Sequence, residues 1–336
     1  MAGQGASFIA SLILTCLGLT FVTFFIGRFI PADPVLALVG DHATREIYDK
    51  ARLAMGLDKP VVTQYLIYLK KVLSGDFGHS VITSQPVLSD LLHFFPATLE
   101  LATLATVIGV LVGVPAGVAA GALRGRWPDH LVRFLGLFGY SMPVFWLGLV
   151  GLWLFYAKLD WVAGPGRIDV GFEDLVERRT GVLLVDAALA GQWDAFNNAL
   201  AHIALPATLL GYISLAYIAR MTRSFMIDAL SQEYVVAARI KGCTFWGAVW
   251  THAFPNILVS LITVVGLSYA SLLEGAVLTE TVFAWPGLGL YITRSLFNAD
   301  MNAVLAGTLV VGAVFIGVNT TCDFLYRIVD PRLRTA

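Results

Sequence analysis

The chain has 336 residues, of which 57% are hydrophobic and 13% are charged, whereas a soluble domain usually carries about 25% charged residues. This composition favours a membrane protein. The formal net charge of −1 gives no bulk attraction to nucleic acid. We therefore expect no nucleic-acid partner. The three cysteines, Cys16, Cys243 and Cys322, lie too far apart for a zinc or redox motif, so we expect no metal site.

Six apolar stretches are long enough to cross a bilayer core, which takes about 20 residues. The expected transmembrane helices lie at about 7–29, 97–123, 132–157, 200–219, 256–278 and 302–325. The first stretch could be a cleaved signal peptide, but its apolar run is longer than a signal peptide requires and no basic segment precedes it. We therefore expect it to be retained.

Lysine and arginine in the short connections predict the orientation, because basic loops stay in the cytoplasm. Segment 158–199 holds more acidic than basic residues and is expected outside. Both termini are then cytoplasmic, although the N-terminal residues MAGQGAS carry no basic side chain in support. The basic residues of the expected cytoplasmic regions are Arg124, Arg126, Arg133, Arg220, Arg223, Arg239, Lys241, Arg327, Arg332 and Arg334.

Segment 31–95 is too polar to cross lipid and too regular to be disordered. Gly56 suits a helix end and Pro60 a helix start. Beyond Pro60, apolar residues recur at helical spacing. We expect two short helices on the outer membrane surface. The recurring apolar residues are Val62, Leu66, Leu69 and Leu73.

Three expected spans contain proline, at Pro115, Pro143 and Pro206, and each predicts a kink that neighbouring helices can tolerate. Small residues at intervals of four in the second span would let another helix approach closely. These features indicate a packed bundle rather than a single anchor. The small residues are Gly109, Gly113 and Gly117.

Two carboxylates, Glu100 and Glu274, lie in or near the apolar stretches. A carboxylate inside a membrane is costly and points to a functional site. Both are also within reach of the headgroup region, so a structural role remains equally open. Glu274, with Tyr140 and Met142, is our hypothesis for the substrate path.

Segment 221–252 separates the fourth and fifth spans. Burying its five charged residues in lipid would cost well over roughly 10 kcal/mol, so it must lie in the cytoplasm. Its part SQEYVVAARIKG predicts a helix capped by Ser231 and ended by Gly242, and the apolar run CTFWGAVWTHAF predicts a second helix. Ala237 and Ala238 have small side chains, so another protein could approach this part of the helix closely. The alternative is a hairpin that packs only on its own bundle.

This segment resembles the cytoplasmic coupling loop of binding-protein-dependent ABC importers, whose general pattern is E-A-A-x3-G-x9-I-x-L-P. Gly242, Ala237, Ala238 and Pro255 match the glycine, the two alanines and the proline. Val236, His252 and Phe254 depart from the glutamate, isoleucine and leucine. Glu233 therefore inherits no role from that glutamate. The form EYxxxARxKG of the peptide-importer branch fits better. Further stretches fit the same branch in order: IPADPV, GLDKP, SGDFGHS, PATLELA, GYSMPVFWLG, RMTRSFM, TETVFAWPGLG and VDPRLR.

The resemblance covers nearly the whole chain and is strongest to the first permease subunit of dipeptide and oligopeptide importers. It implies an all-α type I ABC importer fold with six transmembrane helices and outer surface helices, in the bacterial inner membrane. The implied partners are a homologous second permease, two ATP-binding subunits, a periplasmic peptide-binding protein and membrane lipid. The implied parts are a first helix at 1–30, a periplasmic segment at 31–95, a transmembrane domain at 96–326 with the coupling loop at 221–255, and a cytoplasmic tail at 327–336.

The chain has no G-x4-G-K-[ST] phosphate loop and no nucleophile or metalloprotease motif. We therefore expect a transport subunit that is not itself an enzyme, binds no cofactor and leaves ATP to its partners. The residues expected to contact the ATPase are Ala237, Ala238, Arg239, Lys241, Gly242, Phe245 and Trp246.

Other readings remain open at this point. The same kind of permease could carry a nickel complex, glutathione, an antibiotic peptide or an oligosaccharide. An ion-coupled secondary transporter, with Glu274 as its coupling acid, is more remote because such proteins carry more polar groups in their spans. An intramembrane protease would need paired catalytic groups at membrane depth, which the spans do not offer.

Overall fold

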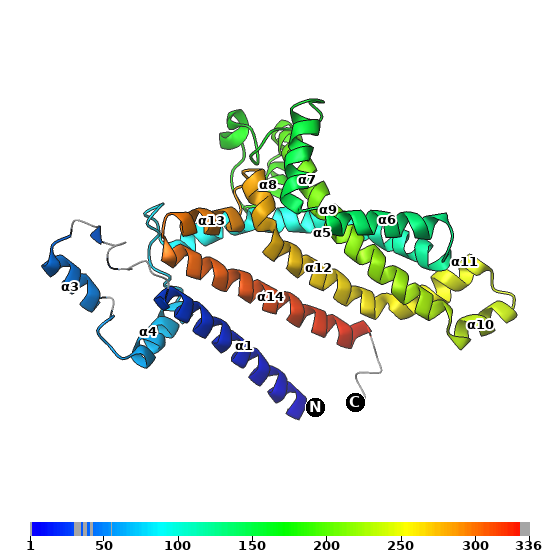
Figure 1. Ribbon diagram of the computed structural model, residues 1–336, viewed down its shortest axis with the longest axis horizontal. Helices are drawn as coiled ribbons and strands as arrows, with labels where there is room; N and C mark the ends of the chain where they lie inside the picture. The colour runs from blue at the N-terminus through cyan, green and yellow to red at the C-terminus, as the bar shows by residue number, and fades with distance from the viewer. Residues whose placement is uncertain (1, 30–34, 36–38, 41–42, 55, 330–336) are drawn as a thin grey trace. The chain divides into compact units, whose positions relative to one another are not determined.

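The computed structural model describes residues 2–29, 35, 39–40, 43–54 and 56–329 (Figure 1). It divides into two compact units, one formed by Met1–Phe95 and Gly287–Ile316 and the other by Pro96–Pro286 and Gly317–Ala336. Within the described ranges all regular elements are helical, apart from an isolated bridge between His79 and Pro86. The expected stretch IPADPV lies almost wholly outside the described residues, as does the end of the predicted tail.

The first unit holds α1 (Ala2–Phe29), α3 (Arg45–Ala54), α4 (Val61–Leu73) and α13 (Leu288–Phe297). It also holds the first part of α5 (Val87–Ala122) and of α14 (Met301–Val329). Its core is a cluster of buried side chains from α5, α13 and α14. These side chains are Val87, Leu91, Leu288, Tyr291, Ala303 and Ala306.

The two short helices expected in segment 31–95 are present as α3 and α4. Gly56 has a φ of +68°, a left-handed backbone that separates them, and Pro60 precedes the first residue of α4. The Tyr65 and Tyr68 hydroxyls lie 3.0 and 3.1 Å from the hydroxyls of Thr20 and Thr23. Helix α4 thus packs on α1 through its tyrosines. Its predicted apolar face at Val62, Leu66 and Leu73 stays exposed.

The second unit holds the rest of α5, then α6 (Trp127–Ser141) and α7 (Val144–Gly151) with a π-helical turn, η1 (Leu152–Tyr156). The loop that follows carries the 3₁₀ turn η2 (Val170–Leu175) and α8 (Leu183–Leu189). Helix α9 (Trp193–Leu230) then leads to α10 (Glu233–Ile240) and α11 (Phe245–Gly247). A second π-helical turn, η3 (Ala248–Ala253), continues into α12 (Phe254–Val282).

Four helical stretches among the described residues are long and apolar enough to cross a membrane. They are Val87–Ala122, Trp193–Leu230, Phe245–Val282 and Met301–Cys322. The bent pair Trp127–Gly139 and Val144–Tyr156 would make a fifth if it forms one span, and the apolar stretch Ala10–Ile26 of α1 is shorter. The count of six therefore stays a prediction.

The prolines act differently from one another. Pro115 and Pro206 lie inside the continuous helices α5 and α9. At Pro143 the helix breaks, because the residue before a proline avoids the helical region, and Met142 has a ψ of 130°. The third expected span is thus two helices rather than one kinked helix.

The expected close approach of helices is confirmed between α5 and α9, which run side by side (Figure 1). A β-carbon on Gly117 would lie 2.6 Å from the carbonyl oxygen of Ala219, and one on Gly113 would lie 3.1 Å from that of Leu215. Helix α12 packs on α9 as well, where the buried Ser214 and Ser268 hydroxyls lie 2.9 Å apart. These three helices support the two sites described next.

Candidate functional site

The segment between α9 and α12 forms an elbow of two short helices, residues 231–253. Helix α9 runs beyond its expected end at residue 219 to Leu230, where the Ser231 hydroxyl donates to the carbonyl oxygen of Asp228 at 2.7 Å. The prediction that Ser231 caps the next helix is wrong, because Ser231 instead ends α9. Helix α10 starts after Gln232 without a side-chain cap.

Gly242 turns the chain at the end of α10, as predicted. Its φ of +95° lies in the left-handed region, and its N–H donates to the carbonyl oxygen of Arg239 at 3.0 Å. A β-carbon at this position would meet no atom within 4 Å. The turn therefore needs glycine for its backbone conformation and not for lack of space.

The chain beyond Gly242 connects directly to α12. The Thr244 hydroxyl accepts a hydrogen bond from the N–H of Gly247 at 3.1 Å and so caps α11. From Phe245 to Val282 the helical stretch is unbroken, with η3 as its second turn. Any displacement of α11 is therefore carried directly into α12.

The elbow is fixed to the bundle by a buried apolar cluster. Val235 of α10 is 4% exposed and lies in one cluster with residues of α5, α9, η3 and α12. The two helices of the elbow thus share a core with the long helices. The other buried members are Val118, Met226, Ala229, Ala248, Val249, Ala253 and Ile257.

The opposite face of the elbow is exposed and carries the predicted contact residues. Six of the seven predicted residues are exposed and only Ala238 is half-buried. The Arg239 guanidinium lies 5.5 Å from the centre of the Phe245 ring, within the range of a cation–π contact. The six exposed residues are Ala237, Arg239, Lys241, Gly242, Phe245 and Trp246.

Sequence reasoning missed three apolar members of this face. Ile240 is 81% exposed, and Val236 and Trp250 are exposed as well. Val236 and Ile240 are four residues apart and so share one side of α10. That spacing could have identified them. The exposed face combines apolar side chains with two cations, a composition suited to a protein partner.

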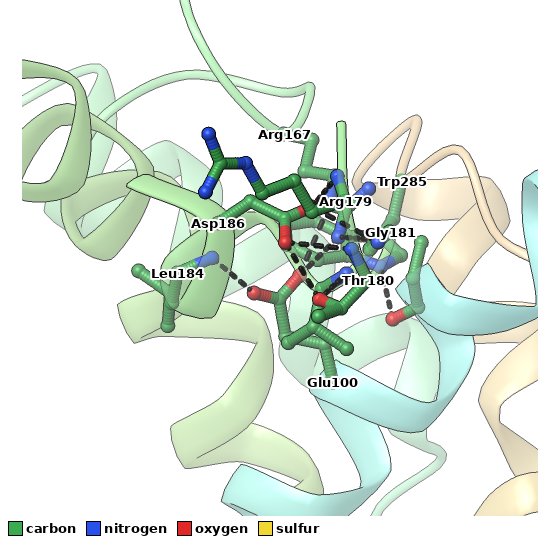
Figure 2. A network of polar contacts seen from close by, with 10 residues as sticks. Glu100, Arg167, Arg179, Thr180, Gly181, Leu184, Asp186 and Trp285 are labelled. Carbon is green, nitrogen blue, oxygen red and sulfur yellow. Dashed lines mark hydrogen bonds and ion pairs between the residues drawn. The ribbon is translucent and has the colours of Figure 1, made fainter. Parts of the chain in front are cut away.

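A second site, built from polar groups, lies around Glu100 within α5 (Val87–Ala122). Glu100 points from α5 to Arg167 and Leu184 (Figure 2). Its Oε2 accepts hydrogen bonds from Nε and Nη2 of Arg167 at 3.0 and 2.5 Å, and its Oε1 accepts one from the N–H of Leu184 at 2.8 Å. The pair is buried, with side chains 3% and 16% exposed. The structure thus gives Glu100 a structural role, tying loop 158–192 to α5.

Asp186 organises the neighbouring turn (Figure 2). Its carboxylate accepts hydrogen bonds from the N–H groups of Arg179, Thr180 and Gly181 and from the Thr180 hydroxyl. Burial alone would raise the pKa of this carboxyl, but the hydrogen bonds outweigh burial and hold the pKa below its usual value. The ionised Asp186 therefore holds the turn in place.

The same loop contacts the turn after α12. The Arg167 guanidinium lies 5.8 Å from the centre of the Trp285 ring, whose Nε1–H donates to the carbonyl oxygen of Ala97 at 2.9 Å. The N–H of Gly166 donates to the carbonyl oxygen of Phe283 at 2.8 Å. The stretch around Trp285, singled out in the sequence, is thus joined to loop 158–192.

The residues proposed for the substrate path are described only in part. Glu274 is exposed on α12 and Met142 is half-buried at the break after α6, while the side chain of Tyr140 lies outside those described. A carboxylate that sequence reasoning missed, Glu280, is fully buried and accepts a hydrogen bond from the Thr98 hydroxyl at 2.6 Å. The path itself stays a prediction.

Comparisons with known proteins agree over the chain's length. The family model described as "Binding-protein-dependent transport system inner membrane component" matches residues 113–335, and the model for the N-terminal part of such membrane components matches 7–102. The chain is 43% identical to a probable D,D-dipeptide transport system permease protein of Escherichia coli (strain K12) over 322 residues, 96% of this chain and 94% of that protein.

Other relatives also match over nearly their whole length. A di/tripeptide transport system permease protein of Pseudomonas aeruginosa (strain UCBPP-PA14) is 41% identical and covers 96% of each chain. Among solved structures, inward-facing conformations of the MetNI methionine ABC transporter match with a TM-score of 0.52 at 17% identity, over 74% of this chain and all of that one. The fold is thus the all-α type I ABC importer fold.

Proposed function

The chain belongs to the family of binding-protein-dependent transport system inner membrane components, and from this premise we propose that it carries dipeptides or short peptides as the permease subunit of an ATP-driven importer. Its relatives at 41–43% identity are named as dipeptide and di/tripeptide permeases. The observation that carries the proposal is the exposed elbow, which shares a core with α5, α9 and α12.

The proposed complex supplies what this chain lacks. Since the sequence has no phosphate loop, two partner subunits would bind ATP, and a homologous permease would complete the path. A periplasmic peptide-binding protein would deliver the cargo. The chain is a multi-pass inner membrane protein that needs no cofactor of its own in this scheme. In the proposed orientation both termini and the elbow are cytoplasmic.

The elbow would transmit motion as a rigid body. Closure of the ATPase pair would push on the exposed face at Ile240 and Trp246, and the buried Val235 cluster would pass that push to the long helices. Because η3 runs into α12 without a break, α12 and α9 would move with the elbow. The path would then open alternately to each side.

A substitution at Gly242 tests this coupling. Gly242→Val would force a β-branched residue into a left-handed backbone, which rearranges the elbow without a direct clash. We expect dipeptide uptake by the reconstituted complex to fall while the complex still assembles. Gly191→Val is the matched control, since Gly191 also has a positive φ, +69°, and open space around it. Normal uptake by the Gly242→Val complex would contradict the coupling role.

The cargo is tested through the binding protein that works with this chain. Dipeptides and tripeptides should raise its unfolding temperature, since a ligand that binds the folded state stabilises it. Nickel complexes, glutathione, antibiotic peptides and oligosaccharides form the comparison panel. Stabilisation by one of these alone would overturn the peptide assignment and leave the coupling mechanism intact.

Segments 31–95 and 158–199, which are expected outside the membrane, are proposed to bind the periplasmic binding protein. The exposed apolar face of α4 at Val62, Leu66 and Leu73 supports this role, because α4 meets α1 through other residues. Replacing all three by serine should weaken docking of the binding protein and leave ATPase-subunit binding unchanged. The control Tyr65→Phe with Tyr68→Phe removes the hydroxyl contacts to Thr20 and Thr23 of α1 and keeps the exposed face. Unchanged docking in the serine variant would mean that α4 meets lipid instead.

A further inference from the structure

His202 joins helix α9 to loop 158–192 through both nitrogens of its ring. Its Nδ1 lies 2.9 Å from the carbonyl oxygen of Gly164, and its Nε2 lies 3.2 Å from the Oδ1 of Asp169. The histidine side chain is 3% exposed, whereas that of Asp169 is 62% exposed. A buried histidine therefore holds an exposed carboxylate of the loop, at a place that has no part in the proposed coupling.

Both oxygens beside the ring are acceptors. The carbonyl oxygen of Gly164 can only accept, so Nδ1 must carry a hydrogen. The other oxygen of Asp169 accepts from the Asn198 side chain at 2.6 Å. That hydrogen bond and, to a smaller extent, the charge of His202 hold the pKa of the Asp169 carboxyl below its usual value. An ionised carboxylate also only accepts, so the arrangement requires N–H groups on both ring nitrogens, which is the charged imidazolium.

Loss of one proton from the ring would change the contact with Asp169. A neutral imidazole has a single N–H group. The Gly164 carbonyl is half-buried and the Asp169 carboxylate is mostly exposed, so Asp169 is the acceptor that can turn to water instead. With the hydrogen kept on Nδ1, the lone pair of Nε2 would face the carboxylate. The contact between His202 and Asp169 would then lose its attraction.

The other groups beside the ring bring no competing charge. Among the described residues, Asp169 is the charged group in contact with His202. On the same loop, Arg167 is already paired with Glu100 of α5. From η1, the uncharged Tyr156 ring would lie 3.0 Å from a β-carbon on the loop glycine that Nδ1 contacts. The protonation of the histidine therefore controls the contact.

Asp169 lies at the start of a mostly exposed segment, residues 169–180. The carboxylate of Asp186 holds the far end of this segment through the N–H groups of residues 179–181. Near its start, Val170 is 82% exposed. The contact with His202 thus fixes the start of the segment to α9.

We propose that the contact between Asp169 and His202 is a pH-sensitive attachment of segment 169–180 to α9. The attachment holds while His202 is protonated and opens when His202 loses its proton. Histidine commonly titrates between about pH 5 and pH 8, so the start of the segment is held in mild acid and released as the pH rises. On the acid side, Asp169 loses its charge only below about pH 4.

The attachment has a consequence for transport. Segment 158–199 is proposed to bind the periplasmic binding protein, so release of residues 169–180 would make that docking depend on the pH outside the cell. This consequence rests on the proposed function, whereas the attachment itself does not.

The attachment is tested by electron paramagnetic resonance of the full chain in detergent. A nitroxide label on Val170→Cys reports whether the segment is held, in a background where Cys16, Cys243 and Cys322 are serine. Between about pH 5 and pH 8 we expect the ratio of mobile to immobile label to rise about two- to fivefold, as for loss of a partly exposed charge pair. A ratio that does not change with pH would overturn the proposal.

Two variants act on the contact in different ways. The amide nitrogen of Asp169→Asn can donate to the neutral Nε2 while its oxygen still accepts from Asn198, so the label should stay immobile as the pH rises. His202→Asn keeps an amide donor for Gly164 and removes the positive charge beside Asp169. In that variant the label should be mobile at every pH.

The matched controls are Asp174→Asn, which removes an exposed carboxylate from the same segment, and His79→Asn, which removes another exposed histidine. Both should keep the response of the wild type. The proposal is overturned if Asp169→Asn or His202→Asn keeps that response, or if a control loses it. The label is measured without peptide or ATPase subunits, so failure of the transport proposal would leave this result unchanged.

Discussion

A buried ion pair depends on both of its members, because a single charge left in a poorly solvated site is costly. Glu100 and Arg167 form such a pair, and Arg167 also donates to the carbonyl oxygen of Gly181 at 2.8 Å. Removing the carboxylate charge would leave the guanidinium without its counter-ion. The pair therefore controls how firmly loop 158–192 is held.

We predict that Glu100→Gln lowers the free energy of unfolding of the chain by about 3–5 kcal/mol, the usual cost of breaking a buried pair. Thermal unfolding of the purified chain in detergent measures it. Glu177→Gln is the control, because Glu177 and Arg179 form an exposed pair at 3.1 Å, and it should change the free energy by less than about 1 kcal/mol. Equal effects of the two substitutions would contradict the structural role of Glu100.

At the scale of elements, the contact of α5 with α9 depends on the absence of side chains. A β-carbon on Gly109, Gly117 or Gly121 would come too close to α9, and one on Gly113 would make a tight contact of 3.1 Å with the carbonyl oxygen of Leu215. The backbones can therefore approach closely, which gains dispersion contacts along the whole pair. A methyl group at Gly117, where a β-carbon would lie 2.6 Å from the backbone carbonyl oxygen of Ala219, must push the helices apart.

We predict that Gly117→Ala destabilises the chain by about 1–3 kcal/mol through overpacking. Gly275→Ala is the matched control in α12, where a β-carbon would meet nothing within 4 Å, and it should be neutral or slightly stabilising. Unfolding temperatures of the two variants give the comparison. If both glycines tolerate alanine equally, α5 and α9 do not pack as described.

The turn at residues 179–186 is predicted to loosen in acid. The pKa of Asp186 is lowered in the folded chain, so its stabilisation is complete above the unfolded pKa of about 3.9 and is lost as the pH falls through the lower, folded value. Proteolysis at the exposed Arg179 or nearby should therefore rise only below about pH 4.

Asp186→Asn should make this turn accessible already at neutral pH and remove most of its pH dependence. The exposed Asp174→Asn serves as the control and should behave as wild type. A turn that opens at the same pH in wild type and in Asp186→Asn would show that another group is responsible.

At the scale of the whole molecule, the proposed orientation places two ends of the second unit on opposite sides of the membrane. Arg124 lies in the connection between α5 and α6, and Val170 lies in the loop after η1; both are exposed. In this proposal the basic residues near Arg124 would keep it in the cytoplasm, and the acidic loop around Val170 would lie outside.

We predict that a membrane-impermeant maleimide added to intact cells labels Val170→Cys and does not label Arg124→Cys. Inverted vesicles should show the reverse. The experiment needs a background in which Cys16, Cys243 and Cys322 are serine. Labelling of both positions from the same side would refute the orientation, and with it the cytoplasmic elbow.

The class of the protein, the helical nature of its segments and the glycine at the elbow could be read from the amino-acid sequence alone. These properties are local: apolar length decides whether a segment can cross lipid, and a left-handed residue calls for glycine wherever it occurs. For the same reason Gly56 and Gly242 follow the ends of helices and Pro60 precedes the start of one, as the pattern predicted. Most of the residues predicted for contact at the elbow are exposed, and Val236, Ile240 and Trp250 are exposed residues there that the pattern did not single out. Contact of this face with a partner stays a prediction.

Which residues contact one another follows from the packing of the helices. Sequence spacing could not show that Glu100 pairs with Arg167, that Ser231 ends α9 instead of capping α10, or that Asp129 holds Arg223 across two helices. Such contacts join residues that are far apart in the chain, and each polar group chooses among partners that only packing brings within reach. The structural role of Glu100 therefore follows from the fold.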